Sequence, residues 1–159
     1  MKNKTEKTNV MRLLDQQEVS YIPHSYDNSQ AYSGVEVANM IGEDINKVFK
    51  TLVTQGASKQ YYVFVIPVAG SLNLKKAATA AHEKSIVMIP QKELLPLTGY
   101  VHGGCSPIGM KKPFPTFIDE TAVLNDTIIF SAGKIGYQVE TGLEELKKVL
   151  DYQLADVCD

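Results

Sequence analysis

One lysine stands in an unusual place for a charged side chain. Lys50 lies in the stretch VFKTLV at residues 48–53, which alternates between two faces as a β-strand does. Its neighbours on the same face are Val48 and Leu52, so its ammonium group either meets solvent or reaches into a cleft. A partly desolvated ammonium group binds a phosphate or a developing oxyanion well. The alternative is an edge-strand lysine that discourages aggregation.

A glycine-rich stretch is the second chemical feature. Residues 99–112 read GYVHGGCSPIGMKK, and four of the eleven glycines of the chain fall between 99 and 109. Adjacent Gly103 and Gly104 allow positive φ angles and a close approach of the backbone to a ligand. Pro107 restricts Ser106 to an extended conformation. The N–H groups of such a turn can bind an anion or a carbonyl oxygen, although many glycine-rich loops only change the direction of the chain.

The same loop contains a base and two nucleophiles, His102, Cys105 and Ser106. A hydrolase would need the imidazole held within hydrogen-bonding distance of the attacking group. A loop fixes no such spacing, and no acidic residue lies nearby in the sequence to orient His102. We therefore expect neither the Cys105 thiol nor the Ser106 hydroxyl to be the nucleophile. The alternative is a thiol hydrolase that uses Cys105. Three scattered histidines and two distant cysteines predict no metal site and no cofactor.

Short helices and strands must position these residues. The hydrophobic pattern predicts helices near 5–17, 33–41, 74–82, 90–95 and 143–152, and strands near 19–25, 47–55, 60–67, 86–89, 116–119, 127–131 and 137–140. The strands at 47–55 and 60–67 form a hairpin in this prediction. Regular βαβ spacing is missing, which argues against a doubly wound sheet. The predicted fold is a single compact α/β domain whose sheet is mixed and mostly antiparallel, or a partial barrel, surrounded by helices.

Length and composition limit the classes of protein. With 159 residues, 44% of them hydrophobic, residues 1–159 fit one domain, with a core over 4–150 and a frayed tail at 153–159. The net charge is −2 and Arg12 is the only arginine, which argues against reading of DNA sequence. Residues 45–140 carry ten basic and six acidic side chains, a balance that suits contact with phosphates.

The sequence also argues against a membrane protein. No apolar run approaches the roughly 20 residues that a membrane-spanning helix needs. Residues 1–9 contain no apolar segment of the kind found in signal peptides. Two cysteines are too few for a disulfide framework. The predicted location is therefore the cytoplasm.

Two motifs together resemble the YbaK/EbsC family of Cys-tRNA(Pro) deacylases, which is related to the editing domain inserted in bacterial prolyl-tRNA synthetases. They are VFKTLV at 48–53 and GGCSPIGMKK at 103–112, and the resemblance runs from residue 4 to residue 150. The family's lysine matches Lys50, its GxxxP loop matches residues 103–107, and its pocket tyrosine matches Tyr26. The C-terminal carboxylate of the family has its nearest counterpart in Glu145, to which we assign no role.

The resemblance implies an enzyme that cleaves the ester joining cysteine to the 3′ end of tRNA(Pro), with Cys-tRNA(Cys) as a further substrate. In this family the thiol of the substrate attacks its own carbonyl group and releases the tRNA and a cyclic thiolactone, so the protein needs no nucleophile. The partners implied are the 3′ end of tRNA(Pro) and prolyl-tRNA synthetase. The residues implied are Lys50, Gly103, Gly104, Cys105 and Ser106 for catalysis, and Tyr26, Pro107, Ile108 and Gly109 for substrate binding.

Two alternative functions stay open on the sequence. Sister groups with similar folds edit other mischarged tRNAs such as Ala-tRNA(Pro). A non-catalytic domain of this fold would bind tRNA or a synthetase without cleaving anything.

Overall fold

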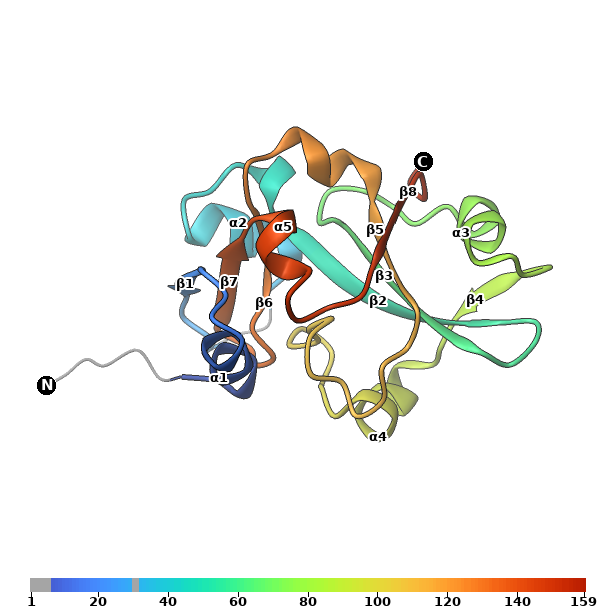
Figure 1. Cartoon of the computed structure of the whole chain (residues 1–159), viewed down its shortest axis with the longest axis horizontal. Coiled ribbons are helices and arrows are strands. Elements are labelled where there is room, and N and C mark those ends of the chain that lie inside the picture. Colours follow the sequence, from blue (N-terminus) through green and yellow to red (C-terminus); the bar gives the residue numbers. More distant parts are fainter. Residues whose placement is uncertain (1–6, 30–31) are drawn as a thin grey trace, which may run out of the picture.

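The strands form two sheets in the computed structural model, which describes residues 7–29 and 32–159 (Figure 1). The smaller sheet has the order β1-β7-β6, with antiparallel pairing throughout. It consists of β1 (Ile22–Ser25), β7 (Tyr137–Thr141) and β6 (Ile128–Ser131). Pro23 lies in β1 at the edge of this sheet, where a residue without an N–H leaves no ladder bond unmade.

The larger sheet has the order β4-β2-β3-β5-β8. Its strands are β4 (Ile86–Met88), β2 (Phe49–Gly56), β3 (Tyr61–Pro67), β5 (Thr116–Asp119) and β8 (Gln153–Ala155). β2 pairs with β3 and β4 in antiparallel fashion, whereas β5 pairs with β3 and β8 in parallel. An isolated bridge between Val48 and Ile129 links β2 to the smaller sheet. The predicted fold class is confirmed, and the sheets do not close into a barrel.

Five short helices cover the sheets: α1 (Asn9–Gln16), α2 (Gly34–Met40), α3 (Leu74–Ala81), α4 (Leu94–Thr98) and α5 (Leu143–Leu146). Residues 45–47, 91–93 and 120–124 form 3₁₀ turns. α2 begins with a capping box, in which Ser33 and Glu36 each bond the other's backbone N–H. No helix within residues 7–29 and 32–159 is long and apolar enough to cross a bilayer.

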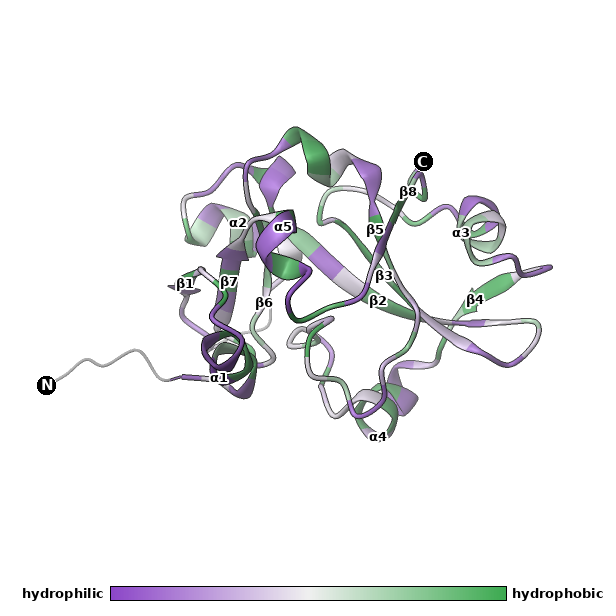
Figure 2. Ribbon diagram, in the orientation of Figure 1, coloured by the Kyte–Doolittle hydropathy of each residue, from purple (hydrophilic) through white to green (hydrophobic). Residues whose placement is uncertain are grey.

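The main hydrophobic core lies between the two sheets and α1. α1 contributes Val10 and Leu14 to it, while β2 contributes Phe49 and Val53 and β6 contributes Phe130. Figure 2 shows hydrophobic colouring along β3 and β4, whereas in β2 a hydrophilic band interrupts it. Alternation along β2 sends Phe49 and Val53 into this core and leaves Lys50 half-buried on the other face. The core thus fixes the strand that presents Lys50.

Two predictions near the C-terminus are wrong. The expected helix at 143–152 ends at Leu146, and its continuation is made of turns. The tail at 153–159 does not fray, because β8 pairs with β5 and Val157 is fully buried. The Val157 N–H donates to the carboxylate of Asp119. Buried hydrogen-bonding partners from elsewhere in the chain hold this segment, and no pattern within the segment itself reveals them.

Candidate functional site

A cavity of about 450 Å³ brings together five of the residues singled out in the sequence, His102 among them. Lys50 comes from β2, Tyr26 follows β1, and Gly103 and Cys105 belong to the glycine-rich loop. Helix α2 and the smaller sheet complete the wall. The lysine-bearing strand and the glycine-rich loop therefore share one hollow.

Lys50 presents its ammonium group to this hollow and has no ion-pair partner among the described residues. It pairs with Ile66 of β3 near the open end of the β2–β3 hairpin, where β4 no longer pairs with β2, so its backbone is held from the β3 side. Its side chain is half-buried, and no carboxylate of the described residues forms an ion pair with it. The described residues that line the cavity also include no aspartate or glutamate. The cavity is thus suited to a ligand that carries negative charge or develops it during reaction.

Hydrogen bonds within the glycine-rich loop, and one to Thr98 just before it, hold the loop in place. Gly104 N–H donates to Val101 O at 3.0 Å, and Lys111 N–H donates to Thr98 O at 3.1 Å. The Tyr100 hydroxyl donates to Ile108 O at 2.5 Å. Burial raises the pKa of Tyr100 to about 12, so the hydroxyl remains a donor over the whole physiological range. The loop is therefore fixed at its start, its middle and its end.

Two glycines are required by the geometry of the loop. Gly103 has φ of +89°, a conformation that other residues rarely adopt. Gly104 lies against the turn between β6 and β7, and a Cβ atom there would come within 3.1 Å of Ile135 N. The absence of side chains thus lets the loop pack against this turn while it borders the cavity.

The N–H groups of the loop are not all available to a ligand. Gly104 already donates to Val101, and Ser106 is fully buried away from the cavity lining. Gly103 and Cys105 line the cavity, and no hydrogen bond of the described residues uses their N–H groups. These two donors can receive an oxygen atom that gains negative charge.

The Cys105 side chain lines the cavity but is a poor nucleophile. It is 7% exposed, and burial raises the pKa of its thiol to about 12, while a hydrogen bond with Thr98 offsets only part of that effect. A thiol with this pKa is almost entirely protonated near neutrality, whereas the thiolate is the attacking form. No hydrogen bond within the described part of the chain joins His102 to Cys105 or Ser106. The Ser106 hydroxyl instead accepts the N–H of Ile108.

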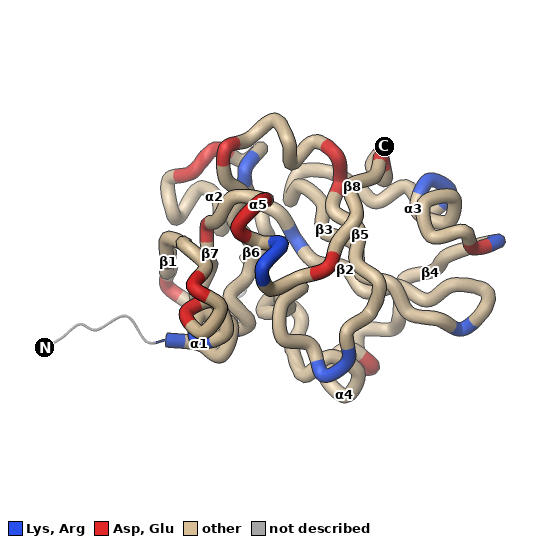
Figure 3. Tube along the Cα trace, viewed as in Figure 1, with Lys and Arg blue, Asp and Glu red and all other residues tan. Residues whose placement is uncertain are grey.

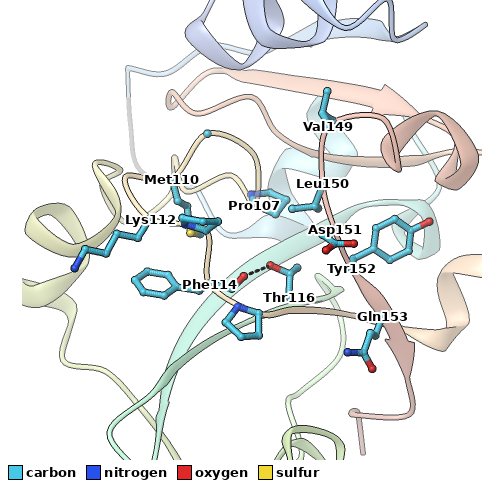
Figure 4. A pocket seen from close by; sticks show the side chains of 13 residues that line it. Pro107, Met110, Lys112, Phe114, Thr116, Val149, Leu150, Asp151, Tyr152 and Gln153 are labelled. Carbon is cyan, nitrogen blue, oxygen red and sulfur yellow. Dashed lines mark hydrogen bonds between the residues drawn. The ribbon is translucent and has the colours of Figure 1, made fainter.

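The structure separates the other predicted binding residues from this cavity. Ile108 is 2% exposed and belongs to the main core. Pro107 and Gly109 line a second hollow of about 470 Å³ on another side of the loop (Figure 4). Figure 4 shows Met110 and Phe114 on one wall of this hollow and Tyr152 on the other. The GxxxP loop therefore divides two hollows, and only its first part reaches Lys50.

The cavity also contains polar and aromatic residues that the sequence motifs did not reveal. Tyr32 meets Tyr26 edge to face, with 6.3 Å between ring centroids, and both rings line the cavity. Thr51 and Gln138 contribute buried polar atoms to the residues that line it. The sequence carries no signal for Gln138, which is an ordinary polar residue within the strand pattern YQVET at 137–141.

A separate cluster of charged groups surrounds Glu140 of β7, which lies two residues after Gln138. Glu140 is bonded by His24 at 2.7 Å, by Lys47 at 3.1 Å and by Thr127. Burial by itself would raise the pKa of Glu140, but these bonds lower it to about 2. His24, Glu43 and Glu140 have metal-ligating atoms within 4.8 Å of one another. The Lys47 ammonium group already bonds Glu140 there, so the cluster is balanced by a built-in cation.

Glu145, the nearest counterpart of the family's carboxylate, lies elsewhere. It accepts the Ser20 N–H and pairs with Lys148, and it is not among the residues that line the cavity. Figure 3 shows basic residues at separate places along the chain, among them by α3, near α4 and on β2. Among the described residues that line the cavity, Lys50 is the one lysine, and no arginine accompanies it.

Comparisons with known proteins agree with one another. The family model of the aminoacyl-tRNA editing domain matches residues 28–149. A protein of Enterococcus faecalis (strain ATCC 700802 / V583), named "Putative Cys-tRNA(Pro)/Cys-tRNA(Cys) deacylase EbsC", is 42% identical over 98% of this chain and 96% of its own length. A solved structure described as "a putative trans-editing enzyme for prolyl tRNA synthetase" matches with a TM-score of 0.81 at 21% identity, over 97% of this chain and 99% of that one. The crystal structure of the hypothetical protein APE2540 matches with a TM-score of 0.84 at 20% identity, over 94% and 99%.

Proposed function

This chain belongs to the family of aminoacyl-tRNA editing domains, and we propose that it cleaves the aminoacyl ester of Cys-tRNA(Pro), with Cys-tRNA(Cys) as a further substrate. The extent of identity to the Enterococcus protein supports this substrate class. Cysteine and proline are close in size, so a synthetase pocket rejects cysteine poorly, and a second site that destroys the wrong product solves the problem. The observation that carries the proposal is the shared cavity of Lys50 and the glycine-rich loop.

The cavity offers a distinct partner for each part of the 3′ end. Tyr26 and Tyr32 provide aromatic surface on which the terminal adenine can stack. The Lys50 ammonium group anchors the terminal phosphate or polarises the ester. The N–H groups of Gly103 and Cys105 hold the carbonyl oxygen as it gains negative charge. Catalysis then rests on positioning and charge stabilisation.

We assign the attack to the thiol of the substrate. Its sulfur forms a bond to its own carbonyl carbon, the ester C–O bond breaks, and the thiol proton ends on the departing ribose oxygen. The products are free tRNA and a four-membered thiolactone of cysteine. The raised pKa of the buried Cys105 thiol supports this assignment, because the protein itself presents no activated nucleophile there.

We further propose that prolyl-tRNA synthetase delivers the substrate and that the reaction takes place in the cytoplasm. The lysines are distributed over the molecule. The affinity that phosphate contacts give to a tRNA complex depends on how many lysines contact phosphates at the same time. A chain with one lysine in its cavity gains selectivity for tRNA(Pro) from a partner that already holds it.

The decisive experiment incubates the purified chain with Cys-, Ala- and Ser-tRNA(Pro) and with Cys-tRNA(Cys), and measures the half-life of each ester. We expect rapid loss of the cysteinyl esters and no acceleration for alanine or serine, which lack the thiol. Equal cleavage of Ala-tRNA(Pro) would indicate the alternative editing specificity. An unchanged half-life of Cys-tRNA(Pro) would refute the proposal and favour a non-catalytic binding domain.

The Cys105→Ala variant separates the two mechanisms. If the substrate thiol attacks, the variant keeps most of the activity, because only the backbone N–H of residue 105 is used. A thiol hydrolase would lose all turnover with the same change. Melting temperatures of both proteins control for the small cavity that the substitution creates.

A further inference from the structure

Two side-chain atoms in the described part of the chain are fully buried without a hydrogen-bond partner. They are the hydroxyl oxygen of Thr51 and the amide oxygen of Gln138. Both residues line the cavity of Lys50, although they come from different sheets, Thr51 from β2 and Gln138 from β7. Buried polar atoms are nearly always bonded in folded proteins, so their coincidence at one cavity requires an explanation.

Gln138 is the more informative of the two because its unbonded amide oxygen can only accept a hydrogen bond, whereas the Thr51 hydroxyl can donate or accept one. The residue is 7% exposed, and its strand position is fixed between Ser131 of β6 and His24 of β1. A buried acceptor without a partner costs about 1–3 kcal/mol, which a ligand donor would recover. The last torsion of a glutamine side chain is broad, so the amide can turn toward a ligand with little strain.

The lining of the cavity narrows the identity of that donor. Lys50 is a cation and can satisfy only acceptors on the substrate, such as a phosphate or the ester carbonyl. No aspartate or glutamate within the described residues lines the cavity, so a substrate N–H group finds only neutral acceptors. The amino acid of an aminoacyl ester carries several N–H donors on one atom, its α-amino group. The α-amino nitrogen is bonded to the α-carbon, which also carries the ester carbonyl group. A donor in this position is therefore close to the carbonyl that reacts.

We propose that Gln138 is the specificity residue that receives the α-amino group of the aminoacyl ester. This inference rests on the proposed function and adds to it the part of the substrate that Gln138 recognises. A free α-amino group is present on every aminoacyl-tRNA and is acylated on a peptidyl-tRNA. The site therefore favours esters of free amino acids and discriminates against N-acylated ones, in addition to any selection for the thiol.

The test removes the amino group from the substrate and the acceptor from the protein. The two substrates are tRNA(Pro) charged with cysteine and tRNA(Pro) charged with 3-mercaptopropionic acid, which keeps the thiol and lacks the amino group. Each enzymatic rate is divided by the uncatalysed rate of the same ester, because an α-amino group activates its own ester. We expect the wild-type chain to prefer the cysteinyl ester by about tenfold or more in this corrected kcat/KM, the loss expected for one unsatisfied buried acceptor.

Three variants assign the preference to Gln138. Gln138→Met removes the acceptor at similar volume and is expected to slow the cysteinyl ester while leaving the deaminated ester unchanged, so that the preference disappears. Gln138→Glu keeps an acceptor oxygen and is expected to keep the preference, which maintains the test if the methionine variant is unstable. Gln153→Met changes an exposed glutamine of β8 outside the cavity and serves as the control.

The outcomes distinguish the two proposals. If the wild-type chain cleaves both esters with equal corrected efficiency, or if Gln138→Met slows both by the same factor, Gln138 does not receive the amino group. If the wild-type chain leaves Cys-tRNA(Pro) intact, the proposed function falls and this inference falls with it. A preference retained in Gln138→Met also overturns the assignment.

Discussion

Tyr100 links the rigidity of the glycine-rich loop to catalysis, and its hydroxyl group can be removed without removing its ring. The side chain lies beside two glycines with positive φ: a Cβ atom would come within 2.9 Å of the hydroxyl oxygen at Gly109 and within 2.9 Å of the ring at Gly133. The hydroxyl donates to the carbonyl of Ile108, a residue of the main core. In Tyr100→Phe the ring keeps its contacts, and the Ile108 carbonyl is left buried without its donor.

The size of the effect follows from this loss. An unsatisfied buried carbonyl costs about 1–3 kcal/mol, which lowers the free energy of unfolding by a similar amount or shifts the loop toward a new partner. Gly103 and Cys105 precede Ile108 in this loop, and their N–H groups are assigned to the carbonyl oxygen of the substrate. Because small misplacements of catalytic groups are costly, we expect kcat to fall about tenfold while KM changes by less than about twofold.

Single-turnover deacylation of Cys-tRNA(Pro) at varied protein concentration separates the two constants. Tyr152→Phe is the matched control, because the Tyr152 hydroxyl donates to a backbone carbonyl, that of Leu143, at 2.8 Å and lies outside the cavity. It is expected to lose comparable stability and no kcat. If both variants lose kcat in proportion to their loss of stability, or if Tyr100→Phe keeps wild-type kcat, the loop is not positioned in the way described.

Three further predictions address the cation, the buried carboxylate and the C-terminal strand. Lys50→Ala should slow deacylation at least about tenfold, or 1.4 kcal/mol of transition-state stabilisation, and wild-type kinetics would leave Lys50 a structural residue only. Because the folded-state pKa of Glu140 is lowered to about 2, its contribution to stability is complete above the usual pKa and is lost as the pH falls from about 4.5 toward 2. Over that range the free energy of unfolding should depend less steeply on pH in Glu140→Gln than in the wild-type chain. Identical slopes for the two proteins would contradict the assignment. Deletion of residues 153–159 should lower the melting temperature markedly, since it removes β8 and buried Val157, and an unchanged value would show that the strand contributes nothing.

Local patterns predicted the elements of this fold more reliably than their ends. The helices expected near 33–41 and 74–82 both form, and their capping residues Ser33 and Asn73 each accept a backbone N–H three residues ahead. The β2–β3 hairpin follows from alternation in two adjacent stretches. β8 depends instead on groups far away in the sequence, because it pairs with β5 and Asp119 accepts the Val157 N–H just beyond it. A pattern read over ten residues contains no information about such partners.

The candidate site shows the same division between local and distant information. Lys50 and Gly103 were recognisable because each is an unusual residue for its local context, a lysine between aliphatic residues and a glycine beside a second glycine. Gln138 is ordinary in its context, and only the pairing of β7 with both β1 and β6 buries it beside the cavity. Its importance comes from a bond that is missing, and a missing bond becomes visible only once all neighbours are in place. The residues to which we assign catalysis could therefore be proposed from the sequence, whereas the residue assigned to recognise the amino group required the fold.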